Sequence, residues 1–279
     1  STTVYQSYNT GNVQGYTGVG GVVGAMYNGS IANSYNLGTL KSTRQASDGS
    51  LEPLNMGGVV GDTTEDAGAN AVIYDVYNAG TIGDSGFEYY GRHVGGVVGR
   101  LSGTLEKSYN TGDVYNGYST VGGVVGWWYR GNITNVLNTG NVTVRVDSTE
   151  NNARTNGSQV GGIAGAAAAE GDGKKLKNAY NLGTIRSFTV TNGDYDTTIN
   201  SMGGIIGNVN DTTSIENVYT TNNLDAATAE GDTENADYKQ SDAYGVVAGK
   251  GTPKSLTNAF YVKQYDDKTF IAPNNISNK

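Results

Sequence analysis

A two-part motif recurs about seven times along this chain and constrains its fold more than any other feature. The motif begins with a glycine-rich block of the form V-G-G-V-V-G, and a second block resembling I-x-N-S-Y-N-T-G follows after a short gap. The first full copy covers Val19 to Gly24 and then Ile31 to Leu40. Tandem repeats of this length form elongated structures in which each repeat packs only against its neighbours. The sequence therefore predicts an elongated repeat protein.

The spacing of the Gly-Gly pairs indicates the kind of repeat. The pairs or their equivalents begin at Gly20, Gly57, Gly95, Gly122, Gly161, Gly203 and Gly245. The shortest interval, 27 residues from Gly95 to Gly122, fits three short parallel strands with tight corners. Two glycines in each unit disfavour helical repeats, and the unit is short for a four-stranded propeller blade. We therefore expect an all-β fold, a right-handed parallel β-helix (solenoid) of about seven to eight rungs with loop insertions.

Positions within the repeat predict which side chains face inward. The slot of Ile31 holds apolar residues, and the slot of Ser34 holds small or β-branched ones, so both are expected inside. The Ile31 slot is assigned to Val4, Val72, Leu105, Ile133, Leu176, Ile215 and Leu256. The aromatic column of Tyr35 is expected to stack from one repeat to the next. Its position beside the small-residue column leaves its burial undecided.

Two further columns predict corners. The slot of Asn33 is filled in later repeats by Asn135, Asn178, Asn217 and Asn258. Asparagine tolerates left-handed backbone, so we expect a corner here and a ladder of stacked side-chain amides. The slot of Gly38 holds glycine in most repeats and Asn222 in the sixth. Because glycine and asparagine both accept a positive φ, this slot is predicted to be a second turn.

Insertions enter the repeat mainly at one corner and are expected to project from one face. The larger ones cover 41–55, 83–93, 143–159, 186–201 and 225–243. Smaller ones follow the glycine-rich block at 62–71 and 166–175. Residues 1–262 are expected to form one β-helical domain, a fragment of a longer protein. Residues 263–279 are expected to be a C-terminal tail or a last partial rung.

Composition removes several classes of function. The formal net charge of −8 and the lack of a basic stripe make nucleic acid an unexpected partner. The absence of cysteine excludes disulfides and thiolate-bound zinc. No segment approaches the ~20 apolar residues of a membrane span. We expect a monomer.

Few residues suggest chemistry. His93 is the only histidine, which excludes sites built on paired histidines, and we expect it on the surface. Carboxylates occur in variable loops without a basic partner beside them, at Asp62, Glu65, Asp66, Asp194, Asp196 and Asp211. These oxygens suit Ca²⁺, but no calcium-loop motif is present. The sequence therefore predicts no enzymatic activity, no catalytic residues, no metal site and no cofactor.

Aromatic residues gather around the fourth repeat and are the candidate ligand-binding site. Tyrosine and tryptophan offer flat faces for sugars and amphipathic contact area for proteins. The candidates are Trp127, Trp128, Tyr129, Arg130, Tyr89, Tyr90, Tyr115 and Tyr118. The alternative is that one tryptophan packs beneath a loop and the other rings are scattered over the surface.

From about residue 4 to 262 the chain resembles the GLUG-motif repeats, whose Gly-Leu-hydrophobic-Gly core reads here as G-V-V-G, G-I-A-G or G-I-I-G. Such repeats occur in large bacterial surface proteins, including filamentous-haemagglutinin-like adhesins and non-catalytic regions of immunoglobulin A1 protease-type proteins. The resemblance implies an extracellular β-helical stalk at the bacterial surface, a virulence-associated adhesin that binds a host surface glycan or protein, or neighbouring cells. The alternative is a non-catalytic accessory region of a large secreted protease or polysaccharide-active enzyme. The resemblance carries no catalytic residues.

Overall fold

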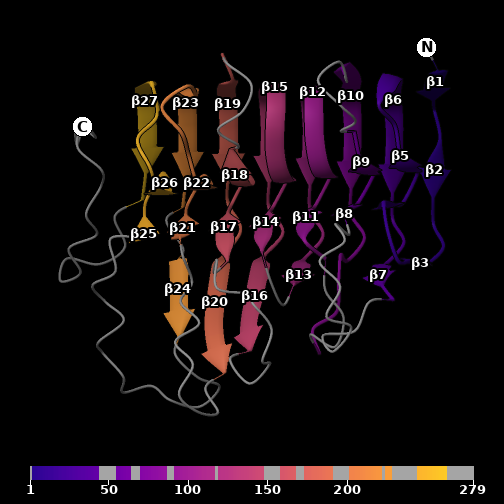
Figure 1. Ribbon diagram of the computed structural model, residues 1–279, viewed down its shortest axis with the longest axis horizontal. Helices are drawn as coiled ribbons and strands as arrows, with labels where there is room; N and C mark the ends of the chain where they lie inside the picture. Colours follow the sequence, from indigo (N-terminus) through magenta and orange to yellow (C-terminus); the bar gives the residue numbers. More distant parts are fainter. Residues whose placement is uncertain are drawn as a thin grey trace.

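The structure is a computed structural model. It describes residues 2–43, 55–63, 70–86, 91–116, 119–147, 158–167, 173–190, 201–221, 224–227 and 244–262. All regular secondary structure in these residues is β, and the strands of all four sheets pair in parallel. Within these ranges no helix is available to cross a membrane. In Figure 1 the strands lie side by side in the order of the repeats. The expected all-β, parallel class is confirmed.

The largest sheet has 14 strands and takes the second block of every repeat. These strands are β1 (Thr2–Tyr5), β2 (Tyr8–Asn9), β6 (Asn28–Asn36), β10 (Asn70–Asn78), β12 (Val98–Asn110), β15 (Val125–Asn138), β19 (Lys175–Asn181), β23 (Ser214–Thr220) and β27 (Ser255–Tyr261). The sheet also includes the end of each glycine-rich block. In β12 and β15 this end and the second block form one continuous strand. Elsewhere that end forms the separate strands β5 (Val23–Ala25), β9 (Val60–Asp62), β18 (Ala164–Ala167), β22 (Ile206–Asn208) and β26 (Ala248–Lys250).

The other three sheets are narrower. The seven-stranded sheet takes the start of each glycine-rich block, in β4 (Val19–Gly20), β8 (Asn55–Gly57), β11 (His93–Gly95), β14 (Thr120–Gly122), β17 (Gln159–Gly161), β21 (Ser201–Gly203) and β25 (Tyr244–Gly245). Four strands follow the second block, namely β13 (Val114–Asn116), β16 (Val142–Asp147), β20 (Ile185–Val190) and β24 (Leu224–Ala227). A two-stranded sheet pairs β3 (Val13–Gly15) with β7 (Leu40–Ser42). The Gly-Gly pairs thus align in register, as expected.

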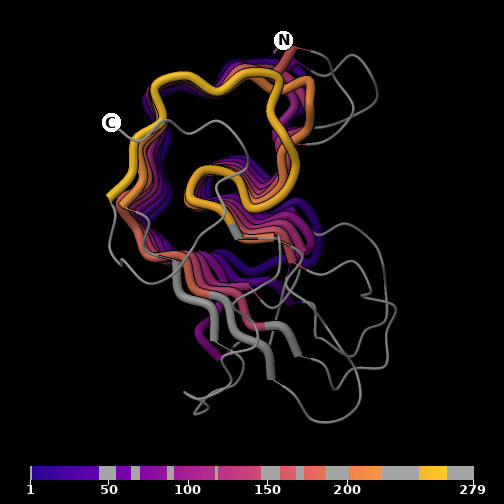
Figure 2. Tube along the Cα trace, turned by 90° about the vertical axis from the view of Figure 1, so that its left-hand side faces the viewer, coloured from indigo at the N-terminus to yellow at the C-terminus, as the bar shows by residue number. Residues whose placement is uncertain are grey.

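Each glycine-rich block folds into an arc between two apolar cores, and in Figure 2 these arcs superpose from repeat to repeat. Val94, just before the glycine pair, lies in the smaller core, whereas Val97 and Val98, just after the pair, lie in the larger core. The two halves of the block are so close that a Cβ on Gly95 would lie 2.1 Å from the carbonyl oxygen of Val98. Close backbone approach therefore explains the glycine at this position of the motif.

The inward column of Ile31 is confirmed except at one repeat. Ile73, rather than Val72, pairs in register with Ile31. Ile73 is fully buried, whereas Val72 is 44% exposed. The assignment of Val72 was wrong because two adjacent apolar residues fit the slot equally well by sequence. The members Leu105, Ile133, Leu176 and Ile215 are buried as predicted, and the end members Val4 and Leu256 are partly buried against the same core.

The corner at Asn33 is confirmed. Asn33 has a φ of 50°, and the same conformation recurs at Gln6, Asp75, Lys107, Asn135, Asn178, Asn217 and Asn258. In the later repeats, the side-chain amides form the expected ladder. Asn178 donates to Asn135 at 2.7 Å, Asn217 to Asn178 at 3.0 Å, and Asn258 to Asn217 at 2.8 Å. We call these four asparagines the outer ladder, because their side chains are exposed or half-buried.

The chain bends at the Gly38 slot, as predicted, but the predicted reason, a positive φ, is wrong. Gly38, Gly80 and Gly112 are not among the described residues with positive φ. Instead, a Cβ on Gly80 would lie 2.0 Å from the carbonyl oxygen of Gly38, and a Cβ on Gly112 would lie 2.0 Å from that of Gly80. The slot therefore needs glycine because successive backbones stack closely. Asn222, which motivated the prediction, lies outside the described residues.

A second column of asparagines, not anticipated from the sequence, lies beside these glycines. Its side-chain amides link consecutive repeats from Asn9 through Asn36, Asn78, Asn110 and Asn138 to Asn181, at 2.7–2.9 Å. Most members also donate to the carbonyl oxygen of the glycine two residues on and accept from its amide. From Asn36 to Asn181 these side chains have no exposed surface. We call this column the inner ladder.

The aromatic column stacks as predicted over its first four members. The ring centroids of Tyr8, Tyr35, Tyr77 and Tyr109 are separated successively by 5.3, 4.9 and 4.9 Å, with nearly parallel planes. The column lies on the outside of the sheet, because Tyr8 is 64% exposed and Tyr109 is 37% exposed. Its burial, left undecided by the sequence, is therefore partial.

Candidate functional site

The candidate aromatic residues of β15 lie at an irregularity in the largest sheet. Arg100 and Leu101 of β12 pair with Trp127 and Trp128, but Ser102 pairs with Arg130. Tyr129 is therefore an extra residue, a β-bulge, and no other pair of described strands carries such a register shift. Bulges commonly redirect side chains beside functional sites. The side chains on either side of Tyr129 are therefore candidates for a functional site.

The two tryptophans have different environments. Trp128 is fully buried in the larger core, and its Nε1–H donates to the carbonyl oxygen of Gly131 at 3.1 Å. The prediction that Trp128 presents a face to a ligand is therefore wrong, because alternation along the strand turns it inward. Trp127 is half-buried and contacts the His93 ring edge-on, with centroids 4.2 Å apart. Trp127 remains a candidate.

Two arginines of neighbouring strands lie over the ring of Tyr129. The guanidinium carbon of Arg130 is 5.0 Å from the centre of its ring, and that of Arg100 is 5.4 Å away. These distances are those of cation–π contacts, which favour a guanidinium placed over an aromatic face. Each of the three side chains keeps part of its surface in solvent. We call Arg100, Trp127, Tyr129 and Arg130 the bulge cluster.

His93 lies beside this cluster and is buried, which corrects the expectation of a surface histidine. Its Nδ1 forms a hydrogen bond with the hydroxyl of Thr120, its register partner in β14. Burial lowers the pKa of His93 well below its usual value, and the charges of Arg92 and Arg100 lower it further. His93 is therefore neutral at pH 7 and leaves the arginines as the cations of this region.

One carboxylate lies in the same column as Arg100. Asp62 of β9 is the register partner of Arg100, and it accepts a hydrogen bond of 2.6 Å from Asn55 Nδ2. Of the other carboxylates considered from the sequence, Asp211 is exposed. Glu65, Asp66, Asp194 and Asp196 lie outside the described residues. No group of three or more metal-ligating side chains occurs in the part of the chain that the structure describes.

Of the remaining candidates, Tyr115 is described by the structure, and it does not join the bulge cluster. Tyr115 lies on β13 of the four-stranded sheet, where its hydroxyl donates to Asp113 Oδ2 at 3.4 Å. Desolvation, followed by the charge of Asp113, raises the pKa of Tyr115. Tyr89, Tyr90 and Tyr118 lie outside the described residues. Arg100 was missed, although its place after V-V-G, equivalent to that of Trp127, could have revealed it.

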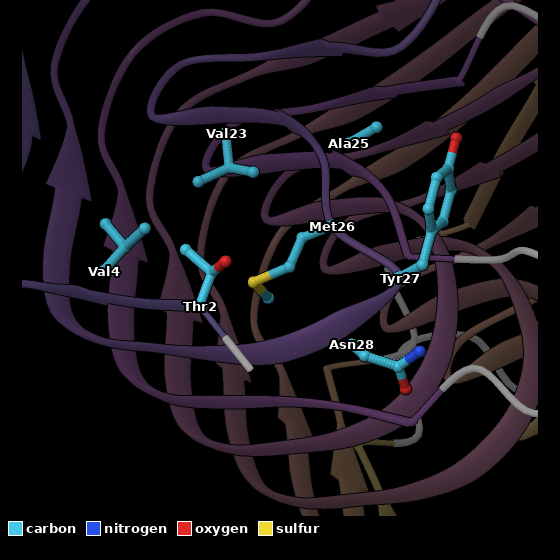
Figure 3. A pocket seen from close by; sticks show the side chains of 7 residues that line it. All are labelled: Thr2, Val4, Val23, Ala25, Met26, Tyr27 and Asn28. Carbon is cyan, nitrogen blue, oxygen red and sulfur yellow. The ribbon is translucent and has the colours of Figure 1, made fainter.

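A separate hollow opens at the N-terminal end of the larger core. It has a volume of about 390 Å³, and Figure 3 shows the side chains that surround it. They are Thr2, Val4, Val23, Ala25, Met26, Tyr27 and Asn28. The lining is mainly apolar and includes no carboxylate, histidine or lysine. It therefore offers no acid–base pair for catalysis.

No family model matches this chain, and no curated protein or solved structure matches it either. The resemblance to GLUG-motif repeats accordingly stays a prediction based on the residues of this sequence.

Proposed function

We propose that residues 1–262 form a right-handed parallel β-helix, a solenoid of seven to eight rungs, within a secreted or surface-displayed bacterial adhesin. In this proposal the segment is a non-enzymatic stalk that presents loops to a host surface glycan or protein, or to neighbouring cells. Its parallel sheets, to which successive repeats contribute strands in order, support the elongated architecture.

The observation that carries the proposal is the constancy of the inner ladder. Its members are separated in sequence by 27, 42, 32, 28 and 43 residues, yet the amides stay 2.7–2.9 Å apart. The repeats thus keep one register while the chain between them varies in length. A scaffold of constant register with variable connections is suited to display, because binding residues concentrate on loops held by a rigid framework.

The composition of the bulge cluster supports recognition. It brings two aromatic rings and two guanidinium groups to one partly exposed region of β12 and β15. Aromatic faces pack on sugars and on protein side chains, and arginine donates several hydrogen bonds from one rigid plane. These groups are suited to hold a polar partner.

The test is a binding screen of the full chain against a broad glycan array and host cell-surface proteins. We expect a specific ligand for the wild-type chain. Absence of any ligand would overturn the adhesive role and favour the accessory region of a larger secreted enzyme. Cleavage of a polysaccharide by the purified chain would overturn the non-enzymatic role. Small-angle X-ray scattering tests the architecture separately, because a solenoid must scatter as an elongated particle.

A further inference from the structure

We propose that the bulge cluster binds a sugar that carries a carboxylate group, such as a uronic or sialic acid residue at the end of a glycan. This inference rests on the proposed adhesive function and names the ligand class for one site. Its elements are the two guanidinium groups of Arg100 and Arg130, the ring of Tyr129 that both contact, and the neighbouring ring of Trp127.

Positive charge is concentrated around the bulge. The whole chain carries a formal net charge of −8. Around the bulge, however, Arg92, Arg100 and Arg130 are cationic, and His93 is neutral because its pKa is lowered. Asp62 contributes one negative charge beside Arg100. An acidic protein that gathers arginines in one region attracts anions there and repels them over much of its remaining surface.

The geometry of the bulge cluster suits a carboxylate group. A guanidinium group donates two parallel hydrogen bonds to a carboxylate, which a lysine ammonium cannot match. The bulge adds Tyr129 between the register partners of Leu101 and Ser102, and both arginines lie over this ring. The half-buried ring of Trp127, the register partner of Arg100, is the aromatic surface suited to the C–H groups of a sugar whose acid group reaches the cations.

The bulge cluster also contains hydrogen-bond donors without acceptors. The Nε–H of Arg100 and the Nε1–H of Trp127 are buried, and neither has an acceptor among the described residues. The two residues are register partners on adjacent strands. Buried donors without acceptors are rare in folded proteins and call for a missing partner. The two donor atoms have almost no accessible surface, so a ligand that binds between these side chains supplies acceptors only when the side chains separate.

The test measures binding of the full chain to two matched pairs of probes: sialyllactose against lactose, and oligogalacturonate against its methyl ester. We expect binding to at least one acid and at least tenfold weaker binding to its neutral counterpart. We expect the Arg100→Gln, Arg130→Gln double variant to lose about tenfold or more in affinity, since charge-assisted hydrogen bonds are the strong ones. Higher salt should weaken the wild-type interaction as well.

One control variant and one further test variant distinguish an effect of the bulge cluster on binding from a general effect of net charge. The Lys175→Gln, Lys254→Gln double variant removes the same number of charges from exposed positions elsewhere and should bind like the wild type. Deletion of Tyr129 removes the extra residue of the bulge and should leave a folded chain with regular pairing between β12 and β15 but weaker binding. Circular dichroism of each variant establishes folding before binding is compared.

The outcomes distinguish this inference from the proposed function. Equal binding of acid and neutral probes, binding of neither acid, or unchanged binding by the folded arginine variant would overturn the carboxylated-sugar site. If the wild type still binds another glycan or a host protein in the broad screen, the adhesive function stands without this site. If the wild type binds nothing in either experiment, both proposals fall.

Discussion

The inner and outer ladders use the same residue type to join successive repeats, but they depend on different physical effects. In the inner ladder, Asn110 donates to Gly112 O and Asn138 Oδ1 and accepts from Asn78 Nδ2 and the Gly112 amide. In the outer ladder, Asn178 is linked by single side-chain hydrogen bonds to Asn135 and Asn217. The inner amides are fully buried, whereas the outer ones keep contact with solvent.

The difference shows what each position requires. The outer position requires a left-handed backbone, and Gln6, Asp75 and Lys107 adopt it at a similar φ in earlier repeats. The inner position requires a group that donates and accepts hydrogen bonds away from water. Within the described residues, this column departs from asparagine only at its C-terminal end, at Thr220 and Tyr261. Backbone strain is thus more easily tolerated here than a lost buried hydrogen bond.

The largest expected effect comes from the glycine column that packs against the inner ladder. Gly112→Val places a Cβ 2.0 Å from the carbonyl oxygen of Gly80, and backbone cannot move away without separating the repeats. We expect a loss of more than about 4 kcal/mol in the free energy of unfolding, or failure to fold. Denaturant titration checks this. The matched change at the adjacent exposed Thr111, Thr111→Val, should stay within about 0.5 kcal/mol. Equal losses would contradict the close stacking.

Asn110→Ala tests the inner ladder directly. The change leaves the Gly112 carbonyl and amide and two neighbouring asparagine amides without their buried partner. We expect a loss of about 3–5 kcal/mol, because buried polar groups that lose a partner cost their full desolvation. Denaturant titration provides the measurement. Asn110→Thr, which introduces the residue type found at Thr220, should lose less. A loss below that of the outer-ladder variant described below would reverse the comparison.

His93 extends the comparison to a buried polar side chain that can be charged. Its pKa in the folded state is lowered by burial and by Arg92 and Arg100, so protonation favours the unfolded state. Stability is unaffected above the unfolded pKa of about 6.5 and decreases as the pH falls below it, by up to about 1.4 kcal/mol per pH unit.

Unfolding free energies between pH 7.5 and 5.5, measured in the wild type and in His93→Gln, test this expectation. Glutamine is the matched replacement because Gln159 occupies the same column. The wild type should lose stability over this range faster than the variant. Parallel curves would show that His93 does not titrate as a buried, neutral side chain.

A smaller effect is expected in the outer ladder. Asn178→Ala places alanine in left-handed backbone and removes two hydrogen bonds that are partly exposed to solvent. We expect a loss of about 1–2 kcal/mol, mostly from the backbone conformation. Thermal or denaturant unfolding measures it. Asn178→Gly keeps the conformation accessible and should cost about 0.5–1 kcal/mol less than alanine. If glycine and alanine cost the same, the hydrogen bonds rather than φ maintain this corner.

The smallest effect is a gain. Lys107 has a φ of 49° and adjoins the column of Asn135, so Lys107→Asn would extend the outer ladder by one repeat. Because asparagine tolerates left-handed backbone better than lysine, we expect about 0.5 kcal/mol of added stability, seen as a higher melting temperature. Loss of the exposed contact of Lys107 with Tyr74 should matter little. Lys107→Gln, which introduces the residue type found at Gln6, should give no gain.

The fold was largely predictable because repetition reveals which residues share a slot. Alignment of the Gly-Gly pairs, the corner at Asn33 and the stack at Tyr35 all follow from recurrence at fixed positions. Recurrence does not give the distance between stacked backbones. The need for glycine at the Gly38 slot was therefore attributed to a positive φ, and the inner ladder that runs from Asn9 to Asn181 was missed. His93 was misplaced because its burial depends on how the arc and the neighbouring side chains pack in three dimensions.

The candidate site was predictable only in part. Adjacent aromatic residues identified Trp127 and Tyr129, but alternation along β15 and the bulge decide which of them remain accessible. Trp128 therefore faces the core, whereas Tyr129 contacts two arginines. Arg100 precedes this segment by one repeat, so only the register between β12 and β15 brings it to the cluster. The site depends on pairing between strands that are distant in sequence.

The unequal sequence separations along the inner ladder have an evolutionary consequence. Consecutive asparagines are 27 to 43 residues apart, but their amides meet at nearly the same distance. A lineage can therefore lengthen, shorten or exchange the segments between the blocks without altering the interior on which folding depends. Selection on those segments and selection on the framework become largely independent, and a descendant can acquire new surface chemistry while it inherits an unchanged core.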